Sequence, residues 1–432
     1  MDSAKRRLQL IQSSLTPHVP QTHRVLVLPD DSQVSISHPV GENTTVTRIH
    51  IDDQPILDFR PLPISAALVL SAVGTPNELD GNPTPKYSLL ELSALDDHGH
   101  QAVTIPDFWA CVYLLWTLLH AQEHIPIVFS LPPTVTTSTA NSTELIDYLL
   151  YSGLGRKRLG NSQRVHDTAE ANCDDQEIIF LSRGAFWQGA GSGVQWGNAR
   201  GWLRGSYASH TSTFPLTNSF TRSPLVIAAH PLRPPNPRPG DCIYKRFCAP
   251  VGQSIAFHAL DLKDEGHVSA FHRWHNDERV NKGWGERGTM EKHIAYMRKV
   301  LDDPHILPIM MSWDGELMGY AELTWIKEDH LVAYVPEGAK DYDRGLHLLV
   351  GEDKYRGGEY AQAWFRSVTH YLFLADPRTQ RIIGEPKHGN AAIMKMSIDG
   401  GMHVQTVFDF PHKRSAMTMN LRERYFKEDM LT

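Results

Sequence analysis

Cysteine and long apolar runs are both scarce in this chain of 432 residues. The four cysteines have spacings that fit neither a zinc knuckle nor a redox CxxC motif, so we expect buried free thiols at Cys111, Cys173, Cys242 and Cys248. The longest apolar run covers residues 108–119. A membrane-spanning helix needs about twenty apolar residues, so this run predicts a buried helix and not a membrane span.

Neither sign of charge dominates the sequence. There are 42 Lys and Arg residues against 49 Asp and Glu residues, a formal net charge of -7, and no long run of one sign. We expect no nucleic-acid partner, because phosphate binding calls for a basic surface. The first residues lack the apolar core of a secretory signal, and the closing Met-Leu-Thr is not a peroxisomal tripeptide. We therefore expect a cytoplasmic protein with no membrane contact, and a peroxisomal one only if the C-terminus is truncated.

Composition divides the chain into three parts. Residues 1–229 alternate strand-like apolar runs with turns and low-complexity segments, and predict an α/β domain without recognisable chemistry. Residues 230–240 are rich in proline, which fixes its own φ and disfavours helix in the preceding residue, so they predict an extended linker. Residues 241–432 form a second predicted α/β (α+β) domain.

The second domain has a regular order of predicted elements. Helices are expected over 265–274, 289–301, 359–374 and 390–399, and strands over 254–262, 307–313, 316–325, 345–351, 381–385 and as a pair around 409–421. The helices are predicted from spacing, because apolar residues such as Met290, Ile294, Met297 and Leu301 recur on one helical face.

Three segments of this domain, and two shorter strings, form a recognisable set. The segments are His272-x-Trp274-x-Asn276-Asp277 with Trp284, Gly345-Leu-His347-Leu-Leu349-Val350-Gly351 with Arg356-Gly357-Gly358, and Gly384-Glu385-Pro386-Lys387 with Asn390; the strings are Phe-Trp-Gln-Gly-Ala-Gly and Asp-Phe-Pro-His-Lys-Arg-Ser. With the order of elements, they resemble the GCN5-related N-acetyltransferase (GNAT) fold. Within that fold they are most similar to the siderophore-biosynthesis N-acyltransferases of the fungal N5-hydroxyornithine acyl-CoA transacylase type.

The resemblance implies a GNAT fold for residues 241–432 and an N-terminal domain that is a degenerate, non-catalytic copy, able to support a homodimer. It implies transfer of an acyl group, anhydromevalonyl or acetyl, from acyl-CoA to the N5-hydroxyamino group of N5-hydroxyornithine, which forms a hydroxamate. Acyl-CoA is then a co-substrate, the partners are small molecules, and no metal is expected.

The resemblance also implies roles for single residues. The acceptor pocket is expected at His272, Trp274, Asn276, Asp277 and Trp284, and the CoA site at Leu349, Val350, Arg356, Gly357, Gly358 and Asn390. Small residues let backbone approach phosphate, and a helix N-terminus presents unpaired N–H donors and a partial positive charge. The catalytic residues are expected at His347, Glu385 and Ser397.

Two departures from the family pattern bear on the catalytic set. Lys387 replaces an acidic residue, so Glu385 is the expected substitute, and Ser397 stands where the fold often has a tyrosine that protonates the leaving thiolate. An alkyl hydroxylamine is uncharged at neutral pH, so its acylation needs mainly positioning, oxyanion support and one proton acceptor.

Other functions stay open or are excluded. The domain could be a catalytically degenerate binding or scaffold module, or could acylate a different amine such as hydroxylysine. A metalloenzyme is not expected, because the histidines at 267, 272 and 275 lack a ligand spacing. A serine hydrolase is not expected either, because Gly-Ala-Gly-Ser-Gly at 189–193 does not join a strand to a helix.

Overall fold

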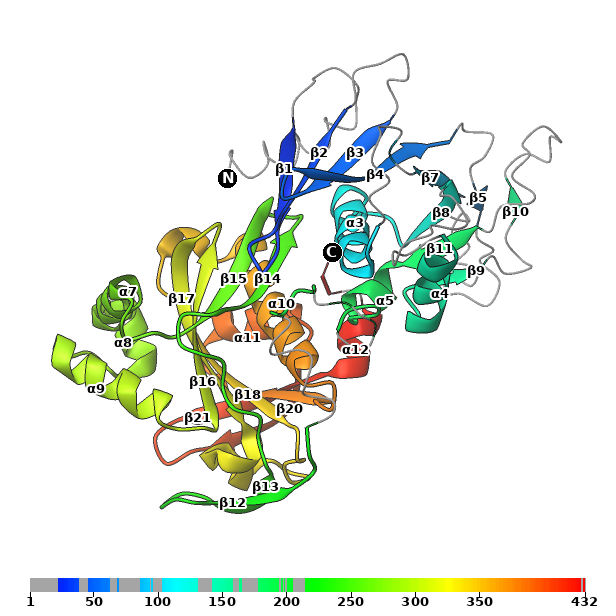
Figure 1. Ribbon diagram of the computed structural model, residues 1–432. Coiled ribbons are helices and arrows are strands. Elements are labelled where there is room, and N and C mark those ends of the chain that lie inside the picture. The colour runs from blue at the N-terminus through cyan, green and yellow to red at the C-terminus, as the bar shows by residue number, and fades with distance from the viewer. Residues whose placement is uncertain are drawn as a thin grey trace. The chain divides into compact units, whose positions relative to one another are not determined.

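The computed structural model describes residues 22–38, 46–62, 68–69, 86–93, 95, 103–130, 142–157, 163–164, 178–193, 196, 198, 200–204, 214–428 and 430–431. The chain divides into two compact units, Met1–Gly201 and Trp202–Thr432. In the described residues each unit contains one eight-stranded sheet (Figure 1).

The second unit carries the helices and strands that the sequence predicts. Its sheet has the order β14-β15-β16-β17-β18-β19-β21-β20. The strands are β14 (Cys242–Cys248), β15 (Gln253–Ala259), β16 (Ile306–Trp313), β17 (Glu316–Trp325), β18 (Arg344–Val350), β19 (Arg381–Gly384), β20 (His403–Asp409) and β21 (Arg414–Leu421). The α-helices are α7 (Glu265–Asn276), α8 (Glu278–Trp284), α9 (Met290–Leu301), α10 (Gly358–Ala375), α11 (Ala391–Asp399) and α12 (Arg422–Lys427).

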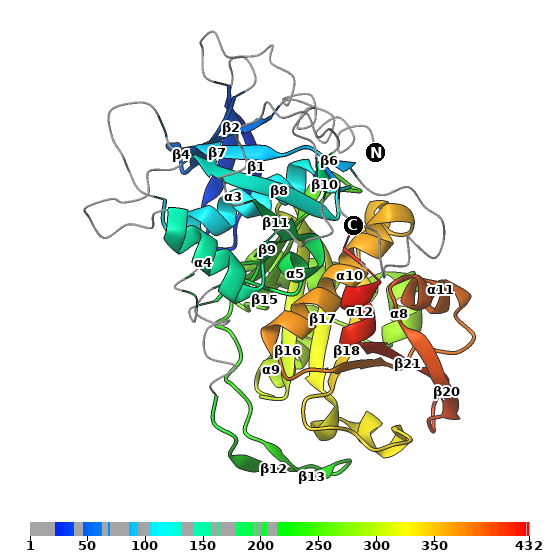
Figure 2. The same cartoon turned by 90° about the vertical axis from the view of Figure 1, so that its right-hand side faces the viewer.

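Helices cover both faces of this sheet. On one face, α7, α8 and α9 bury Phe271 and Trp274 against Tyr320 and Leu349 of the strands (Figure 1). On the other face α10 packs on β14 and β15, where the Tyr244 hydroxyl bonds to His370. The C-terminal helix α12 lies beside α10 (Figure 2). The local sequence sets where the helices begin, since Asp264, Asp277 and Thr289 cap α7, α8 and α9.

The sheet changes from antiparallel to parallel at one place. Strands β14 to β18 are antiparallel, and β18 pairs with β19 in parallel over only two positions, Arg344↔Ile382 and Gly345↔Ile383. Beyond Gly345, β18 continues to Val350 without this ladder, so the two strands separate toward their C-terminal ends. This splay opens at the end of β18 from which the chain passes into α10.

The first unit repeats this topology. Its sheet has the order β1-β2-β3-β4-β7-β8-β11-β9, with the single parallel step at β7–β8. The strands are β1 (His23–Val27), β2 (Gln33–Ser37), β3 (Thr47–Ile51), β4 (Gln54–Pro61), β7 (Leu90–Ser93), β8 (His124–Ser130), β9 (Gly155–Lys157) and β11 (Ile179–Ser182). The helices α3 (Ile105–Leu118), α4 (Ser142–Ser152) and α5 (Arg183–Trp187) follow β7, β8 and β11, as α10, α11 and α12 follow β18, β19 and β21.

Three differences separate this copy from the second unit. The strands β7 and β8 pair over the whole of β7, Leu90↔Ile127 to Ser93↔Ser130, so no splay opens between them. Residues 38–46, between β2 and β3, are too few for the three helices that join β15 to β16. A small separate sheet, β5 (Leu68–Val69), β6 (Lys86–Tyr87) and β10 (Gln163–Arg164), is added.

Helix α3 is the buried helix predicted at 108–119, with residues 108–118 all buried. Among the described residues no helix combines the length and the apolar character needed to span a membrane. Cys111, Cys242 and Cys248 are buried, and no disulfide joins these three described cysteines, whereas Cys173 lies outside the described residues.

The Pro-rich segment 230–240 is not the boundary between the two compact units. The hairpin β12 (Asn218–Arg222) and β13 (Ile227–Pro231) precedes it, and the buried Arg233 forms an ion pair with Glu328 of the second unit. Further upstream, the Trp202 carbonyl accepts from Lys245 and Leu203 pairs with Tyr244 of β14. The described residues of this segment, 202–204 and 214–240, therefore pack as part of the second unit.

Candidate active site

The register of two neighbouring strands brings the first two site residues together. Glu322 of β17 lies directly opposite His347 of β18. Because side chains alternate along a strand, both point to one face together with Tyr320. Glu385 follows the last residue of β19 and reaches the same imidazole from the other side.

His347 lies between two carboxylates. Its Nε2 is 3.0 Å from Oε1 of Glu385, and its Nδ1 is 3.7 Å from Oε2 of Glu322. The carboxylates are buried, but 34% of the His347 side chain is exposed. A substrate can therefore reach the imidazole, while the two acids stay shielded from water.

The charges of the cluster favour a protonated imidazole. Burial alone would lower the pKa of His347, but the hydrogen bonds and negative charges of Glu322 and Glu385 raise it to about 10. Burial would likewise raise the pKa of both glutamates, and the contact with His347 holds each of them below its usual value. The two carboxylates therefore favour the protonated form of the His347 imidazole over the neutral form.

Two tyrosines complete the surroundings of Glu322. The hydroxyls of Tyr296 on α9 and Tyr320 on β17 both donate to its Oε1, at 2.8 and 2.9 Å. Lys413, in the turn between β20 and β21, pairs with the other oxygen of Glu385. Glu322, Tyr296 and Lys413 were not expected from the sequence. A lone acid in an apolar strand was the available signal for Glu322, the same signal that drew attention to His347.

Ser397 is buried on α11. Within the described part of the chain, no hydrogen bond joins it to His347 or Glu385. Asn390 has a structural task, because its side chain caps α11 by accepting from the N–H of Ile393 at 3.3 Å. The structure thus brings together His347 and Glu385 of the expected catalytic set, without Ser397.

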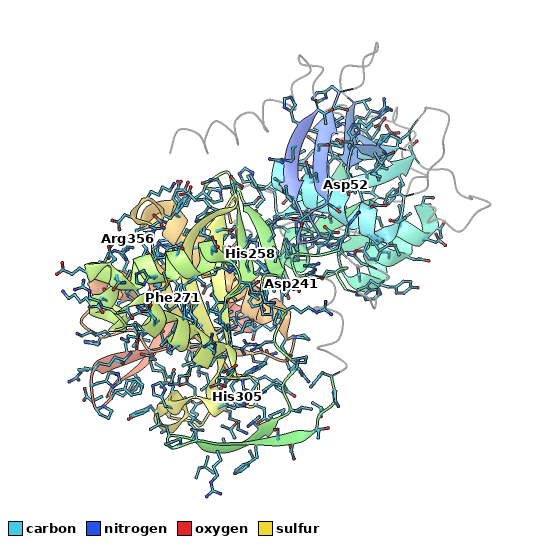
Figure 3. All side chains as sticks on the ribbon, turned by 60° about the vertical axis from the view of Figure 1, so that its left-hand side comes forward. Asp52, Asp241, His258, Phe271, His305 and Arg356 are labelled. Atoms are coloured by element: carbon cyan, nitrogen blue, oxygen red, sulfur yellow. The ribbon has the colours of Figure 1, made fainter. Side chains whose placement is uncertain are left out.

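The loop between β18 and α10 presents backbone donors. Gly357 and Gly358 have φ of +74° and +55°, which L side chains rarely adopt, and a Cβ at either position would meet open space. Gly357 precedes α10 without any side-chain cap, so the first N–H groups of an 18-residue helix are not capped from within the loop. Arg356 beside them is half exposed and pairs with Asp353 at 3.0 Å; Figure 3 shows it at the periphery of the second unit.

The end of β18 is tied to α8. The Arg279 guanidinium donates to the carbonyl oxygens of Val350 and Gly351, at 2.9 and 3.1 Å. Leu349 is buried in the core cluster of α7 to α9. These contacts fix the C-terminal end of β18 against α7 and α8, in the part of the strand that no longer pairs with β19.

A pocket of about 450 Å³ lies at the C-terminal end of α7. Four of the five expected acceptor residues line it, together with Arg273 and Gly351: His272, Trp274, Asn276 and Asp277. The fifth, Trp284, packs its ring 5.8 Å from that of Tyr320, beside the Glu322 cluster.

Two of these pocket residues also hold the local backbone. Asn276 accepts from the N–H of Gly288 and donates to its carbonyl, which fixes the loop before α9. Asp277 caps α8 by accepting from Arg279 and Val280. Trp274 donates from its indole to Glu352 at 2.9 Å, and His272 contacts His293 at 2.8 Å.

One further group of side chains has the residue types of a metal site. Ligand atoms of His230, His305 and Glu328 lie within 4.8 Å of one another, at the hairpin β12–β13 (Figure 3 labels His305). However, Arg233 donates to both oxygens of Glu328, at 2.7 and 3.1 Å, and Thr221 bonds to both imidazoles. The guanidinium already neutralises the carboxylate, so these residues anchor the hairpin.

Comparisons with known proteins agree with this geometry. Residues 263–410 match the family described as the acetyltransferase (GNAT) domain. The acyltransferase ato1 of Omphalotus olearius is 35% identical over 333 residues, which covers 76% of this chain and 78% of that protein. The hydroxyornithine transacylase of Ajellomyces capsulatus is 35% identical over 342 residues, covering 76% and 73%.

A third relative matches nearly the full length. The N(5)-hydroxyornithine:cis-anhydromevalonyl coenzyme A-N(5)-transacylase of Beauveria bassiana is 30% identical over 432 residues, which covers 92% of this chain and 93% of that protein. The resemblance expected from the sequence is confirmed. The chain belongs to the GNAT-fold acyltransferase family that includes these hydroxyornithine transacylases.

Proposed function

We propose that this protein transfers an acyl group from acyl-CoA to the hydroxylamine nitrogen of N5-hydroxyornithine and so forms a hydroxamate. The acceptor is suggested by the names of two relatives. The observation that carries the chemistry is His347, partly exposed and paired with Glu385, on the strand that separates from β19.

Acyl-CoA fits the open side of the splay. Its pyrophosphate would lie on the uncapped N-terminus of α10, with Gly357 and Gly358 allowing close approach and Arg356 adding charge. Backbone groups of Leu349 and Val350 would line the pantetheine arm. The pocket at the end of α7 would take the amino-acid part of the acceptor.

The transfer needs one proton acceptor and one proton donor. The N–C bond forms, the C–S bond breaks, the nitrogen loses a proton to the His347–Glu385 pair, and the CoA thiolate gains one. A hydroxylamine nitrogen is uncharged at neutral pH, so positioning beside the pair supplies most of what the reaction requires. Donation by Ser397 to the thiolate stays a prediction.

The test is CoA thiol release by the purified protein. N5-hydroxyornithine, N6-hydroxylysine and ornithine would be offered with acetyl-CoA and with a longer branched acyl-CoA. We expect release that needs N5-hydroxyornithine and falls at least ~100-fold in His347→Ala, because this variant breaks the His347–Glu385 pair that takes the proton, and a positioned acid–base group contributes about that factor or more. Glu423→Gln, an exposed residue of α12, is the control. If neither acyl-CoA gives any CoA release, the proposal is contradicted and a scaffold role is favoured.

A further inference from the structure

We propose that Glu322 is a positioning residue for the acyl transfer: it holds His347 as an imidazolium between two carboxylates, so that Glu385 accepts the proton of the attacking nitrogen. This inference rests on the proposed function, because it assigns the proton within that reaction. It changes the role expected for His347, from proton acceptor to a fixed positive charge.

The geometry around Glu322 leaves one oxygen for His347. Both tyrosine hydroxyls donate to Oε1, so this oxygen acts as an acceptor, and Oε2 faces the imidazole Nδ1. A carboxylate that receives two hydroxyl donors is stabilised in its ionised form. The direct opposition of Glu322 and His347 in the strand register keeps this oxygen beside Nδ1.

The charged groups around His347 come from every element packed on it. Glu322 lies on β17, Glu385 follows β19, and Lys413 pairs with Glu385 from the β20–β21 turn. On the helix side Tyr296 is uncharged, and burial lowers the pKa of His275 on α7 to about 4, which leaves that imidazole neutral. Two buried carboxylates thus face two cations, and removing the charge of His347 would leave one carboxylate unpaired.

The proton of the attacking nitrogen can then be accepted by Glu385. An imidazolium with a carboxylate at each ring nitrogen has no free lone pair, so it cannot take a proton from the substrate. The Glu385 carboxylate retains lone pairs after pairing with His347 and Lys413. The tetrahedral adduct of a hydroxylamine carries an acidic N–H, so even a weakly basic carboxylate can remove its proton as the C–S bond breaks.

The pH profile of kcat/KM for CoA release distinguishes the two roles of His347. If the imidazolium is the working form, wild-type activity falls only as the pH approaches about 10, the pKa of His347. Glu322→Gln removes one of its two negative partners and should move this alkaline limb down by about one to three pH units. Tyr296→Phe keeps the carboxylate and should move it less, and Glu423→Gln should not move it.

An alkaline limb that Glu322→Gln leaves unchanged, or moves upward, would overturn the proposal. Imidazole ¹⁵N spectra of His347, assigned with His347→Gln, provide a second test in the wild-type protein, so it also decides the case if Glu322→Gln does not fold. Both ring nitrogens should be protonated at neutral pH, and a neutral imidazole would refute the inference. These spectra need no substrate, so they separate this inference from an error in the proposed acceptor.

Discussion

The charge on His347 links the site to the stability of the fold. Its pKa rises from 6.5 to about 10 on folding, so the folded protein holds this proton more tightly than the unfolded chain does. The stabilisation is complete below pH 6.5 and is lost as the pH rises through about 10. We therefore expect the Tm difference between wild type and His347→Gln to be larger at pH 6.5 than at pH 10. A difference that grows with pH would contradict this charge assignment.

Single residues of the site were predictable to different degrees. His347 was predicted because it is a polar residue in an apolar strand, and Glu385 was predicted from the Gly-Glu-Pro-Lys motif. Glu322 was missed because its role depends on the register of β17 against β18, which pairs it with His347. Lys413 reaches Glu385 only through the hairpin of β20 and β21, so no spacing in the sequence indicates this contact.

Directly after β18, the backbone of Gly351 packs tightly against the Trp274 ring of α7. Any Cβ on Gly351 would overlap the Trp274 ring, and both residues line the pocket. Gly351→Ala should therefore lower the free energy of unfolding by about 1–3 kcal/mol, the usual cost of overpacking, measured in urea. Gly283→Ala is the matched control, because its Cβ would meet open space on α8 and alanine favours helix. Equal stability of the two variants would refute this packing.

The N-terminus of α10 carries a prediction about acyl-CoA. Arg356→Ala should raise the KM for acyl-CoA ~10-fold with little change in kcat, since one charge-assisted hydrogen bond is worth about 1.4 kcal/mol or more. Steady-state CoA release measures both constants. Arg424→Ala on α12 controls for the loss of an exposed arginine. A fall in kcat at unchanged KM would place Arg356 outside the CoA site.

The helices and strands that the sequence predicted are those in which apolar residues recur at a regular helical or strand spacing. Helix α9 and strands β16 and β17 match the expected ranges within a few residues. Strand β14 was missed because nearly all of its residues are buried, so it lacks polar–apolar alternation. The hairpin β12–β13 was missed because Pro, Ser and Asn residues dominate its surroundings, and α8 because it is only seven residues long.

The two units share one strand topology in their described residues, and the His347 cluster lies in the second unit. The first unit has β7 fully paired with β8, and the residues between β2 and β3 are too few for the three helices that join β15 to β16. Its strand order agrees with the expected copy of the same topology, and the absence of a catalytic role in this unit stays a prediction. The sequence did not predict the boundary at Gly201, because the contacts of 202–240 with the second unit are tertiary.

Fragments test where the second unit begins. A fragment of residues 202–432 should fold and release CoA, because it contains the whole His347 cluster and its sheet. A fragment of residues 241–432 leaves the buried Glu328 without Arg233, a loss of about 3–5 kcal/mol for a broken buried pair, and should unfold at a lower temperature. Equal Tm values of the two fragments would show that residues 202–240 do not belong to the unit.

The identity of the product tests the proposed acyl transfer to nitrogen. The protein would be incubated with acyl-CoA and N5-hydroxyornithine, and the product analysed by mass spectrometry and by its colour with ferric iron. We expect an N-acyl hydroxamate, which binds ferric iron, to be formed by the wild type and to be nearly absent with His347→Ala. An O-acyl ester of the same mass that gives no ferric complex would contradict it.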